Sequence, residues 1–152
     1  MKSLVVYDSV HGNTRVIAEA ITEAITAELP GESKALYCKD MDVAELEGLD
    51  WLVIGAPTHG GRPAPGMQQF LPKLTKANVG GKKVASFDTR LSTKWVGIFG
   101  YAAGKIGKKL IKLGGELVAD PEGFFVVSTE GPLKDGELKR AAEWAKDLVN
   151  GD

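Results

Sequence analysis

The sequence predicts a protein of the α/β class, a three-layer α/β/α sandwich built on a five-stranded parallel sheet. Short apolar, β-branched segments alternate with longer segments of helical periodicity, which is typical of repeated strand-helix units. Polar stretches follow three of the apolar segments, where parallel sheets carry their binding sites. The length of 152 residues suits one domain, so residues 1–152 are expected to form a single domain.

Five segments share the composition of buried strands. They are Leu4 to Tyr7, Lys34 to Tyr37, Trp51 to Gly55, Val84 to Phe87 and Phe124 to Val127. Right-handed crossovers between them are consistent with the strand order 2-1-3-4-5. In that topology ligands bind beyond the carboxyl ends of the strands, so the loops after strands one, three and four are the expected site.

Apolar periodicity predicts five helices between and after these strands. The first runs from Thr14 to Leu29, and a short second helix begins near Asp42, which together with Glu45 is typical of a capping box. The third is expected from Pro65 to Lys76. The apolar stripe of the fourth helix consists of Ala103, Ile106, Leu110 and Leu113, and that of the fifth of Leu138, Ala141, Ala145 and Leu148.

A tryptophan of the fifth helix and the glycines of the fourth are expected to serve packing and not ligand binding. Trp144 lies beside the stripe of the fifth helix and is expected to pack against the sheet edge. The glycines at Gly100, Gly104 and Gly107 match no nucleotide-binding loop, because they do not follow a strand with the required spacing. We interpret them as close packing inside the fourth helix.

Composition and charge exclude several classes of protein. The net charge of -1 provides no general attraction for nucleic acid or for an anionic membrane. Cys38 is the only cysteine, and besides it only His11 and His59 are soft ligands, so neither a disulfide nor a structural metal site is expected. Neither histidine has a nucleophile partner in the expected loops, so no catalytic set is predicted. The amino-terminal segment is not typical of a signal peptide and no segment has transmembrane length, which predicts a cytoplasmic protein without membrane insertion.

The loop after the first strand leads directly into the first helix, which is an arrangement that binds phosphate. Backbone N–H groups at the helix start and the hydroxyls of Ser9 and Thr14 form a cradle for an anion, and Gly12 allows a close approach of the backbone. The alternative is that Ser9 or Asn13 only caps the helix, as such residues do without any ligand.

This loop resembles the phosphate loop of the flavodoxin family, Ser/Thr-x-Thr-Gly-x-Thr. Ser9, Gly12, Asn13 and Thr14 match as they stand, whereas His11 replaces the middle threonine and can still donate to a phosphate. The resemblance covers essentially the whole chain and implies a flavodoxin-like fold that binds FMN. It places the phosphate against the residues Ser9, Val10, His11, Gly12, Asn13 and Thr14.

The segment after the third strand is the one that lies along the flavin ring in flavodoxin-like proteins. The resemblance assigns cofactor contacts there to Pro57, Thr58, His59, Gly60 and Gly61. The two glycines tolerate the positive φ that a peptide flip requires, although a merely rigid loop is the alternative. Flavodoxins often carry an aromatic residue here, and none occurs before Pro65. Either His59 stacks on the ring, or this face is open to a hydride donor or acceptor.

The segment after the fourth strand is the second expected ring contact. The resemblance places Thr89, Arg90 and Leu91 at the pyrimidine side, where the positive charge of Arg90 would stabilise a reduced anion. The alternative for Arg90 is a solvated salt bridge. Trp95 is expected either to cover the ring or to serve as a core or interface anchor.

Three functions are compatible with these residues. The first is an FMN-containing carrier that passes electrons between redox partner proteins. The second is an FMN-dependent NAD(P)H:quinone-type oxidoreductase with a small acceptor, which the missing aromatic cover and the near-neutral charge favour, because flavodoxin carriers are commonly acidic. The third is a binding module that keeps the fold without the cofactor.

Overall fold

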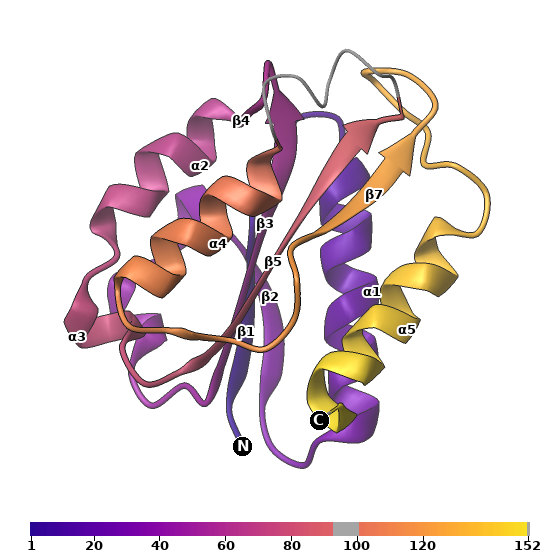
Figure 1. Cartoon of the computed structure of the whole chain (residues 1–152). Helices are drawn as coiled ribbons and strands as arrows, with labels where there is room; N and C mark the ends of the chain where they lie inside the picture. The colour runs from indigo at the N-terminus through magenta and orange to yellow at the C-terminus, as the bar shows by residue number, and fades with distance from the viewer. Residues whose placement is uncertain (93–100, 152) are drawn as a thin grey trace.

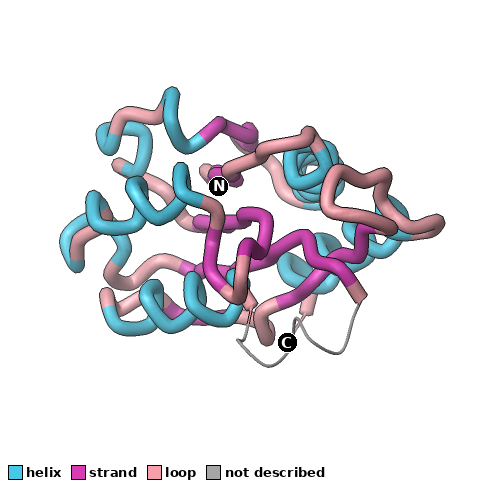
Figure 2. Tube along the Cα trace, turned by 90° about the horizontal axis from the view of Figure 1, so that it is seen from above, coloured by secondary structure: helices cyan, strands magenta, loops and turns pink. Residues whose placement is uncertain are grey.

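The computed structural model describes residues 1–92 and 101–151 of the chain. Its central sheet lies between two layers of helices (Figure 1). One face is covered by α1 (Asn13–Glu28) and α5 (Glu137–Asn150), and the other by α2 (Pro65–Phe70), α3 (Lys76–Val79) and α4 (Ala102–Lys112). The view from above shows the same three layers (Figure 2). The predicted α/β/α sandwich is therefore confirmed.

The sheet keeps the predicted topology with one modification. Its strands are β1 (Ser3–Tyr7), β2 (Ser33–Tyr37), β3 (Trp51–His59), β4 (Arg62–Pro63), β5 (Lys83–Leu91), β6 (Glu116–Leu117) and β7 (Glu122–Val126). The parallel order is β2-β1-β3-β5, and both β6 and β7 pair with β5. Because β6 pairs with the first residues of β5 and β7 with its last residues, these two short strands share the place of the predicted fifth strand.

Two strands continue further than predicted and carry site residues. β3 runs on to His59 and β5 to Leu91, so the segments expected as loops after Gly55 and Phe87 begin as extended strand. The end of β3 is held by antiparallel pairing with β4, and the end of β5 by parallel pairing with β7. These partners supply the hydrogen bonds that keep both segments extended.

The prediction of one continuous helix from Pro65 to Lys76 is wrong, because the helix is interrupted in the middle. α2 is short, a 3-10 turn follows over Leu71–Lys73, and α3 begins only at Lys76. Pro72 lies within the 3-10 turn, has no N–H to donate and blocks continuation of the α-helix. Thr75 then starts α3, since its Oγ1 accepts a hydrogen bond of 3.2 Å from the N–H of Asn78.

The helix expected near Asp42 is a 3-10 turn, Val43–Leu46. Asp42 does cap it, because its carboxylate accepts a hydrogen bond of 3.0 Å from the N–H of Ala44. The predicted capping box with Glu45 is wrong, since the Glu45 carboxylate pairs with Lys34 at 2.8 Å instead.

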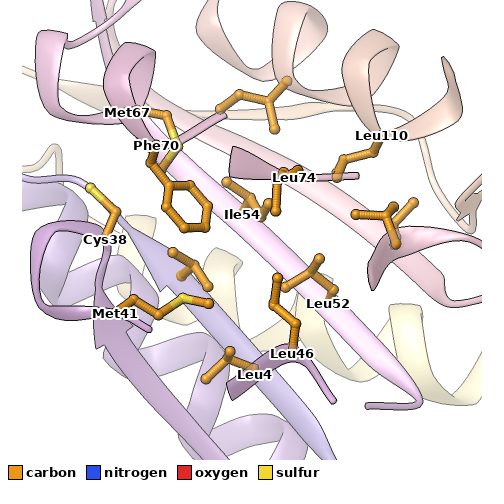
Figure 3. Packing of buried hydrophobic residues seen from close by; sticks show 14 of the residues in the cluster. Leu4, Cys38, Met41, Leu46, Leu52, Ile54, Met67, Phe70, Leu74 and Leu110 are labelled. Carbon is orange, nitrogen blue, oxygen red and sulfur yellow. The ribbon is translucent and has the colours of Figure 1, made fainter. Parts of the chain in front are cut away.

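Buried apolar side chains form one cluster on each face of the sheet. Alternate residues of β1 point to opposite faces, with Leu4 and Val6 on the side of α2 and α4 and Val5 on the side of α1 and α5. Figure 3 shows the first cluster, in which side chains from the strands meet those of α2 and α4. Its labelled members are Leu4, Cys38, Met41, Leu46, Leu52, Ile54, Met67, Phe70, Leu74 and Leu110.

The second cluster confirms most of the predicted stripe of α5. Ala141, Ala145 and Leu148 are buried, but Leu138 is 46% exposed, so its predicted place in the core is wrong. Trp144 packs edge-on against Phe124, with the ring centroids 5.9 Å apart, as expected for a residue at the sheet edge.

The glycines of α4 differ in their surroundings. A Cβ on Gly107 would lie 3.1 Å from Ser86 Oγ and 3.3 Å from Pro121, so the predicted close packing is confirmed there. A Cβ on Gly104 would meet no atom within 4 Å, so the same prediction is wrong for Gly104. Within residues 1–92 and 101–151, no helix has the length and apolar character needed to cross a membrane.

This difference predicts opposite effects of the same substitution. Gly104→Ala should raise the free energy of unfolding by about 0.5–1 kcal/mol, because alanine favours a helix interior. Gly107→Ala should show no such gain, since the added methyl group must displace its neighbours. Urea unfolding of the two variants measures the difference, and equal stabilisation of both would contradict the packing described for Gly107.

Candidate functional site

A pocket lies at the carboxyl ends of β1, β3 and β5. Its volume is about 430 Å³ including the part open to solvent, which is within the range of small-molecule sites. The predicted site residues that line it are Ser9, Val10, His11, Asn13, Thr14, Pro57, Thr58, His59, Thr89, Arg90 and Leu91. Segments that are distant in the sequence are thus brought together as the parallel topology predicts.

Four of the predicted residues are not among those that line the pocket. Gly12, Gly60 and Gly61 lie in the turns beside it, and all three have positive φ, of 91°, 57° and 79° respectively. Trp95 lies outside the described residues, so its expected contact with the ring stays a prediction.

The loop before α1 is shaped by hydrogen bonds to Ser9. The Oγ of Ser9 accepts bonds from the N–H groups of Gly12 at 3.1 Å and Arg15 at 3.4 Å. Because both bonds use the oxygen as an acceptor, the hydroxyl hydrogen of Ser9 is left to donate to a ligand. Gly12 precedes α1 in the left-handed conformation and makes no side-chain cap, whereas the bond from Arg15 shows that Ser9 does cap the first turn, as the alternative expected.

Several backbone N–H groups of this loop have no partner within the chain. In the part of the chain that the structure describes, no hydrogen bond engages the N–H groups of Val10, His11, Asn13 or Thr14. Asn13 and Thr14 form the first turn of α1, which contains no acidic residue. Unpaired N–H groups at the positive end of a helix dipole are the standard protein site for a phosphate.

Two buried polar contacts hold this loop in place. The hydroxyls of Thr14 and Thr89 lie 2.8 Å apart, which links the start of α1 to the end of β5. The buried carboxylate of Asp8 accepts hydrogen bonds of 2.9 Å from the N–H groups of Ser9 and Met67. The loop is therefore fixed from both sides before a ligand binds, which lowers the entropy lost on binding.

The side-chain amide of Asn13 contacts a further loop, which follows β7. Asn13 Nδ2 donates to the carbonyl oxygen of Glu130 at 3.3 Å, and a Cβ on Gly131 would lie 2.5 Å from Asn13 Oδ1. Val126 and Thr129, which belong to the same region, also line the pocket. Sequence reasoning missed them because it placed the site only after strands one, three and four.

Arg90 is fixed on the opposite side of the pocket. Its guanidinium makes two hydrogen bonds to Asp88, of 2.7 and 2.8 Å, and lies over the ring of Tyr101 at 3.4 Å from the centroid. Gly123 leaves the space that the guanidinium occupies, since a Cβ there would lie 2.1 Å from Arg90 Nε. The carboxylate of Asp88 also accepts a bond of 2.9 Å from the N–H of Ala103 in the first turn of α4.

These contacts change the role expected for Arg90. Its side chain is 15% exposed and that of Asp88 is fully buried, so the alternative of a solvated salt bridge is wrong. The positive charge is compensated by Asp88 at close range, so it contributes little field of its own in the pocket. Arg90 therefore shapes the wall of the pocket more than it charges it.

The turn between β3 and β4 forms the third wall. Thr58 lies opposite Pro63 and His59 opposite Arg62 in this short hairpin. The Oγ1 of Thr58 accepts a hydrogen bond of 3.0 Å from the N–H of Ala102, which ties the hairpin to the start of α4. Gly60 and Gly61, between the two strands, have positive φ, which glycine adopts at little steric cost.

Thiol chemistry takes no part in this site. Burial, together with the nearby charge of Asp8, raises the pKa of the Cys38 thiol to about 12, so the thiol stays protonated at neutral pH. Cys38 lies in the apolar cluster of Figure 3. An electron-transfer activity must therefore come from a bound cofactor.

A first helical turn with unpaired N–H groups, a parallel sheet and a pocket between three strand ends are typical of the flavodoxin-like class of fold. Solved structures support it at full length. A flavodoxin from the Archaea has a TM-score of 0.81 and 24% identity, covering 99% of this chain and 97% of that one. Flavodoxin 2 from Bacillus cereus has a TM-score of 0.82 and 23% identity, covering 100% of both chains.

Sequence comparison identifies the family. The flavodoxin domain model matches residues 4–97, and a flavodoxin from Maridesulfovibrio salexigens is 35% identical over 126 residues, which cover 78% of this chain and 82% of that protein. The chain belongs to the flavodoxin family. It is an FMN-binding protein that acts in electron transfer to redox partners, and the predicted fold, cofactor and function are confirmed at this level.

Proposed function

We propose that the pocket holds one FMN, with the phosphate in the loop Ser9 to Thr14 and the ring between the β3–β4 hairpin and the end of β5. We further propose that the chain carries electrons between redox partner proteins. The observation that carries the assignment is the set of unpaired backbone N–H groups at the start of α1. FMN, when bound, supplies the electron-transfer chemistry, and the residues of the chain bind and orient it.

The phosphate contacts are divided between backbone and side chains. The N–H groups of His11, Asn13 and Thr14 would donate to the phosphate oxygens, as would the hydroxyl of Ser9. The hydroxyl of Thr14 is already bonded to Thr89, so its role is to fix the cradle while its N–H contacts the phosphate. Gly12 allows the backbone to turn toward the anion.

The ring contacts come from two strand ends. Pro57, Thr58 and His59 line one side of the pocket, and Thr89, Arg90 and Leu91 line the other. Gly60 and Gly61 form the hairpin turn with positive φ, and we propose that this peptide would be able to change its conformation with the protonation state of a bound flavin. The end of β5 is held rigidly by the Asp88–Arg90 pair and by pairing with β7.

An FMN-dependent NAD(P)H oxidoreductase is the second candidate. The observation that favours it is that the sequence from Pro57 to Pro65 contains no Phe, Tyr or Trp, so the half-buried His59 is the one side chain of this segment that could stack on a ring. An uncovered ring face would admit a hydride donor.

A steady-state assay separates the two candidates. The FMN-loaded protein is mixed with NADH or NADPH and a benzoquinone, and absorbance at the nicotinamide band is followed. A carrier should oxidise neither nucleotide above the rate of free FMN at the same concentration. Turnover that saturates with one nucleotide would instead establish the oxidoreductase.

The hairpin turn makes a further prediction about the redox potential. Gly60→Ala should shift the reduction potential of the bound FMN, because alanine resists the positive φ of this turn while its methyl group meets no atom within 4 Å. The ratio of FMN to riboflavin affinity should stay the same. Potentiometric titration measures the shift. Gly48→Ala is the matched control, since Gly48 has φ of 71°, an equally open surrounding and no place in the pocket. A potential that Gly60→Ala leaves unchanged would remove the role assigned to this peptide.

A further inference from the structure

The charges of this chain are strongly segregated. Although the net charge is -1, eleven of the 19 basic residues lie between Trp51 and Gly115, where Asp88 is the only acidic residue among the 20 of the chain. Asp88 is buried against Arg90, so this pair adds no net charge to the surface and ten basic residues of the segment remain without an acidic counterpart in it. This segment contains α2, α3 and α4, which lie together on one face of the sheet (Figure 1). The net charge of -1 is therefore the sum of a basic region around α4 and an acidic charge on the rest of the chain.

The basic side has its centre on α4. Lys105, Lys109 and Lys112 follow the spacing of a single helical stripe, and α4 contains no acidic residue. Lys109 and Lys112 lie in the last turn, where the helix dipole favours positive charge, whereas Lys105 lies outside that turn. Within residues 1–92 and 101–151, no ion pair involves Lys109, Lys112 or Arg62.

A groove runs between this stripe and α2. Its volume is about 730 Å³ including the part open to solvent. The residues of this basic groove are Arg62, Pro63, Gln68, Leu71, Pro72, Lys105 and Lys109. Apolar surface from Pro63, Leu71 and Pro72 thus lies among cationic side chains, which is the composition of a protein-binding surface with a polar rim.

The β3–β4 hairpin borders both the basic groove and the cofactor pocket. Thr58 and His59 of β3 line the pocket, and their paired residues in β4, Pro63 and Arg62, line the groove. α4 itself is tied to the same hairpin through the hydrogen bond between Ala102 and Thr58. A protein bound in the groove therefore lies against the hairpin that borders the cofactor pocket.

We propose that the basic groove and the lysine stripe of α4 are the docking surface for a small acidic redox protein. The proposal rests on the proposed function of electron carriage, because it identifies the chemistry of the partner. Charge complementarity would steer such a partner to the edge of the molecule where electrons leave the flavin, and it would orient the partner on arrival. The apolar residues of the groove would then supply contact at close range.

A compact acidic protein fits this surface better than an extended polyanion. The remainder of the chain carries nineteen of the 20 acidic residues, so a DNA duplex or an anionic bilayer that extends beyond the groove meets repulsion. A small protein contacts the basic side alone. The segregation of charge thus favours a partner of limited size.

Electron transfer to two haem proteins of opposite charge tests the docking surface. The FMN-loaded protein is reduced and mixed in a stopped-flow instrument with ferric cytochrome b5, which is acidic, or with ferric cytochrome c, which is basic. One electron leaves the reduced flavin and converts one ferric haem to ferrous. The rate with cytochrome b5 should fall about tenfold or more between about 20 and about 200 mM salt, since screening weakens steering. Lys109→Glu/Lys112→Glu should lower the low-salt rate by a similar factor and raise the rate with cytochrome c.

The matched control changes the same charge on the other face. Lys139→Glu/Lys146→Glu exchanges two exposed lysines of α5, and it should alter the rate with cytochrome b5 by less than about twofold. Equal losses in the two double variants, or a rate independent of salt, would overturn the docking surface. Retention on phosphatidylserine vesicles or duplex DNA that only the α4 variant loses, with no effect on cytochrome b5, would overturn it in favour of a polyanion.

Benzoquinone, an uncharged small acceptor, separates this proposal from the proposed function. A chain that does not retain FMN, or that retains it and cannot pass electrons to benzoquinone, contradicts the carrier role itself. A chain that reduces benzoquinone normally in every variant, but shows no dependence on the lysines of α4, contradicts only the docking surface.

Discussion

Asn13→Asp should weaken FMN binding about 10- to 100-fold, which corresponds to roughly 1.4 to 2.8 kcal/mol. Asn13 lines the pocket in the first turn of α1, so a carboxylate there lies beside the proposed phosphate and repels it. The same carboxylate interacts favourably with the helix dipole. The substitution should therefore not destabilise α1 in the FMN-free chain. Riboflavin, which lacks the phosphate, should bind within about twofold of its original affinity. Fluorescence titration with both flavins measures the two affinities.

Asn13→Ala is the control for the lost amide, because Asn13 also donates a hydrogen bond of 3.3 Å to the Glu130 carbonyl. It should cost FMN binding no more than about 1 kcal/mol. If the aspartate variant loses affinity for riboflavin as strongly as for FMN, the phosphate does not bind at the start of α1.

Arg90→Met should lower the free energy of unfolding by about 3–5 kcal/mol. The substitution removes both hydrogen bonds to Asp88 and leaves a fully buried carboxylate with the N–H of Ala103 as its remaining partner. A buried charge without its counter-ion is among the largest single destabilising changes. Urea unfolding of the FMN-free chain is the appropriate measurement, because bound cofactor would itself add stability.

Two variants show whether burial of the pair causes this loss. Arg15→Met breaks the exposed pair with Glu19, whose side chains are 64% and 52% exposed, and should change stability by less than about 0.5 kcal/mol. The double variant Asp88→Asn/Arg90→Met removes the orphaned charge and should recover part of the loss. A loss below about 1 kcal/mol in Arg90→Met alone would mean that solvent screens this pair.

The sequence predicted the site well because parallel topology brings the carboxyl ends of neighbouring strands together. Ser9, Thr58 and Thr89 are distant in the chain, yet each follows or ends a strand that apolar composition identifies. The hydroxyl contact between Thr14 and Thr89 depends on the same juxtaposition. The FMN contacts assigned to individual residues, the single domain of residues 1–152 and the cytoplasmic location stay predictions.

Other features depend on contacts that a linear pattern does not contain. The environment of Arg90 joins Asp88, Tyr101 and Gly123, which come from β5, the start of α4 and β7. Only the folded arrangement shows that the guanidinium is enclosed and its charge compensated. The pairing between β4 and β3 could not be predicted either, because proline is rare within strands and prolines lie close to Arg62.

The interruption of the third helix and the exposure of Leu138 both have local causes. Pro72 is sufficient to end the predicted third helix, and the apolar residues around it extended the helical pattern beyond that break. Leu138 fits the stripe of α5 by spacing, but it is 46% exposed because it borders the open groove between α5 and α1. Spacing predicts which face of a helix is apolar, whereas contact depends on how far the neighbouring layer extends.

The most direct test of the account is a fluorescence titration of the flavin-free chain with FMN. The cradle at the start of α1 predicts quenching that saturates at one FMN per chain, with riboflavin bound more weakly because it cannot use the unpaired N–H groups of the loop. Absence of quenching at a several-fold excess of FMN, or equal affinity for both flavins, would contradict the proposal that this pocket holds FMN by its phosphate.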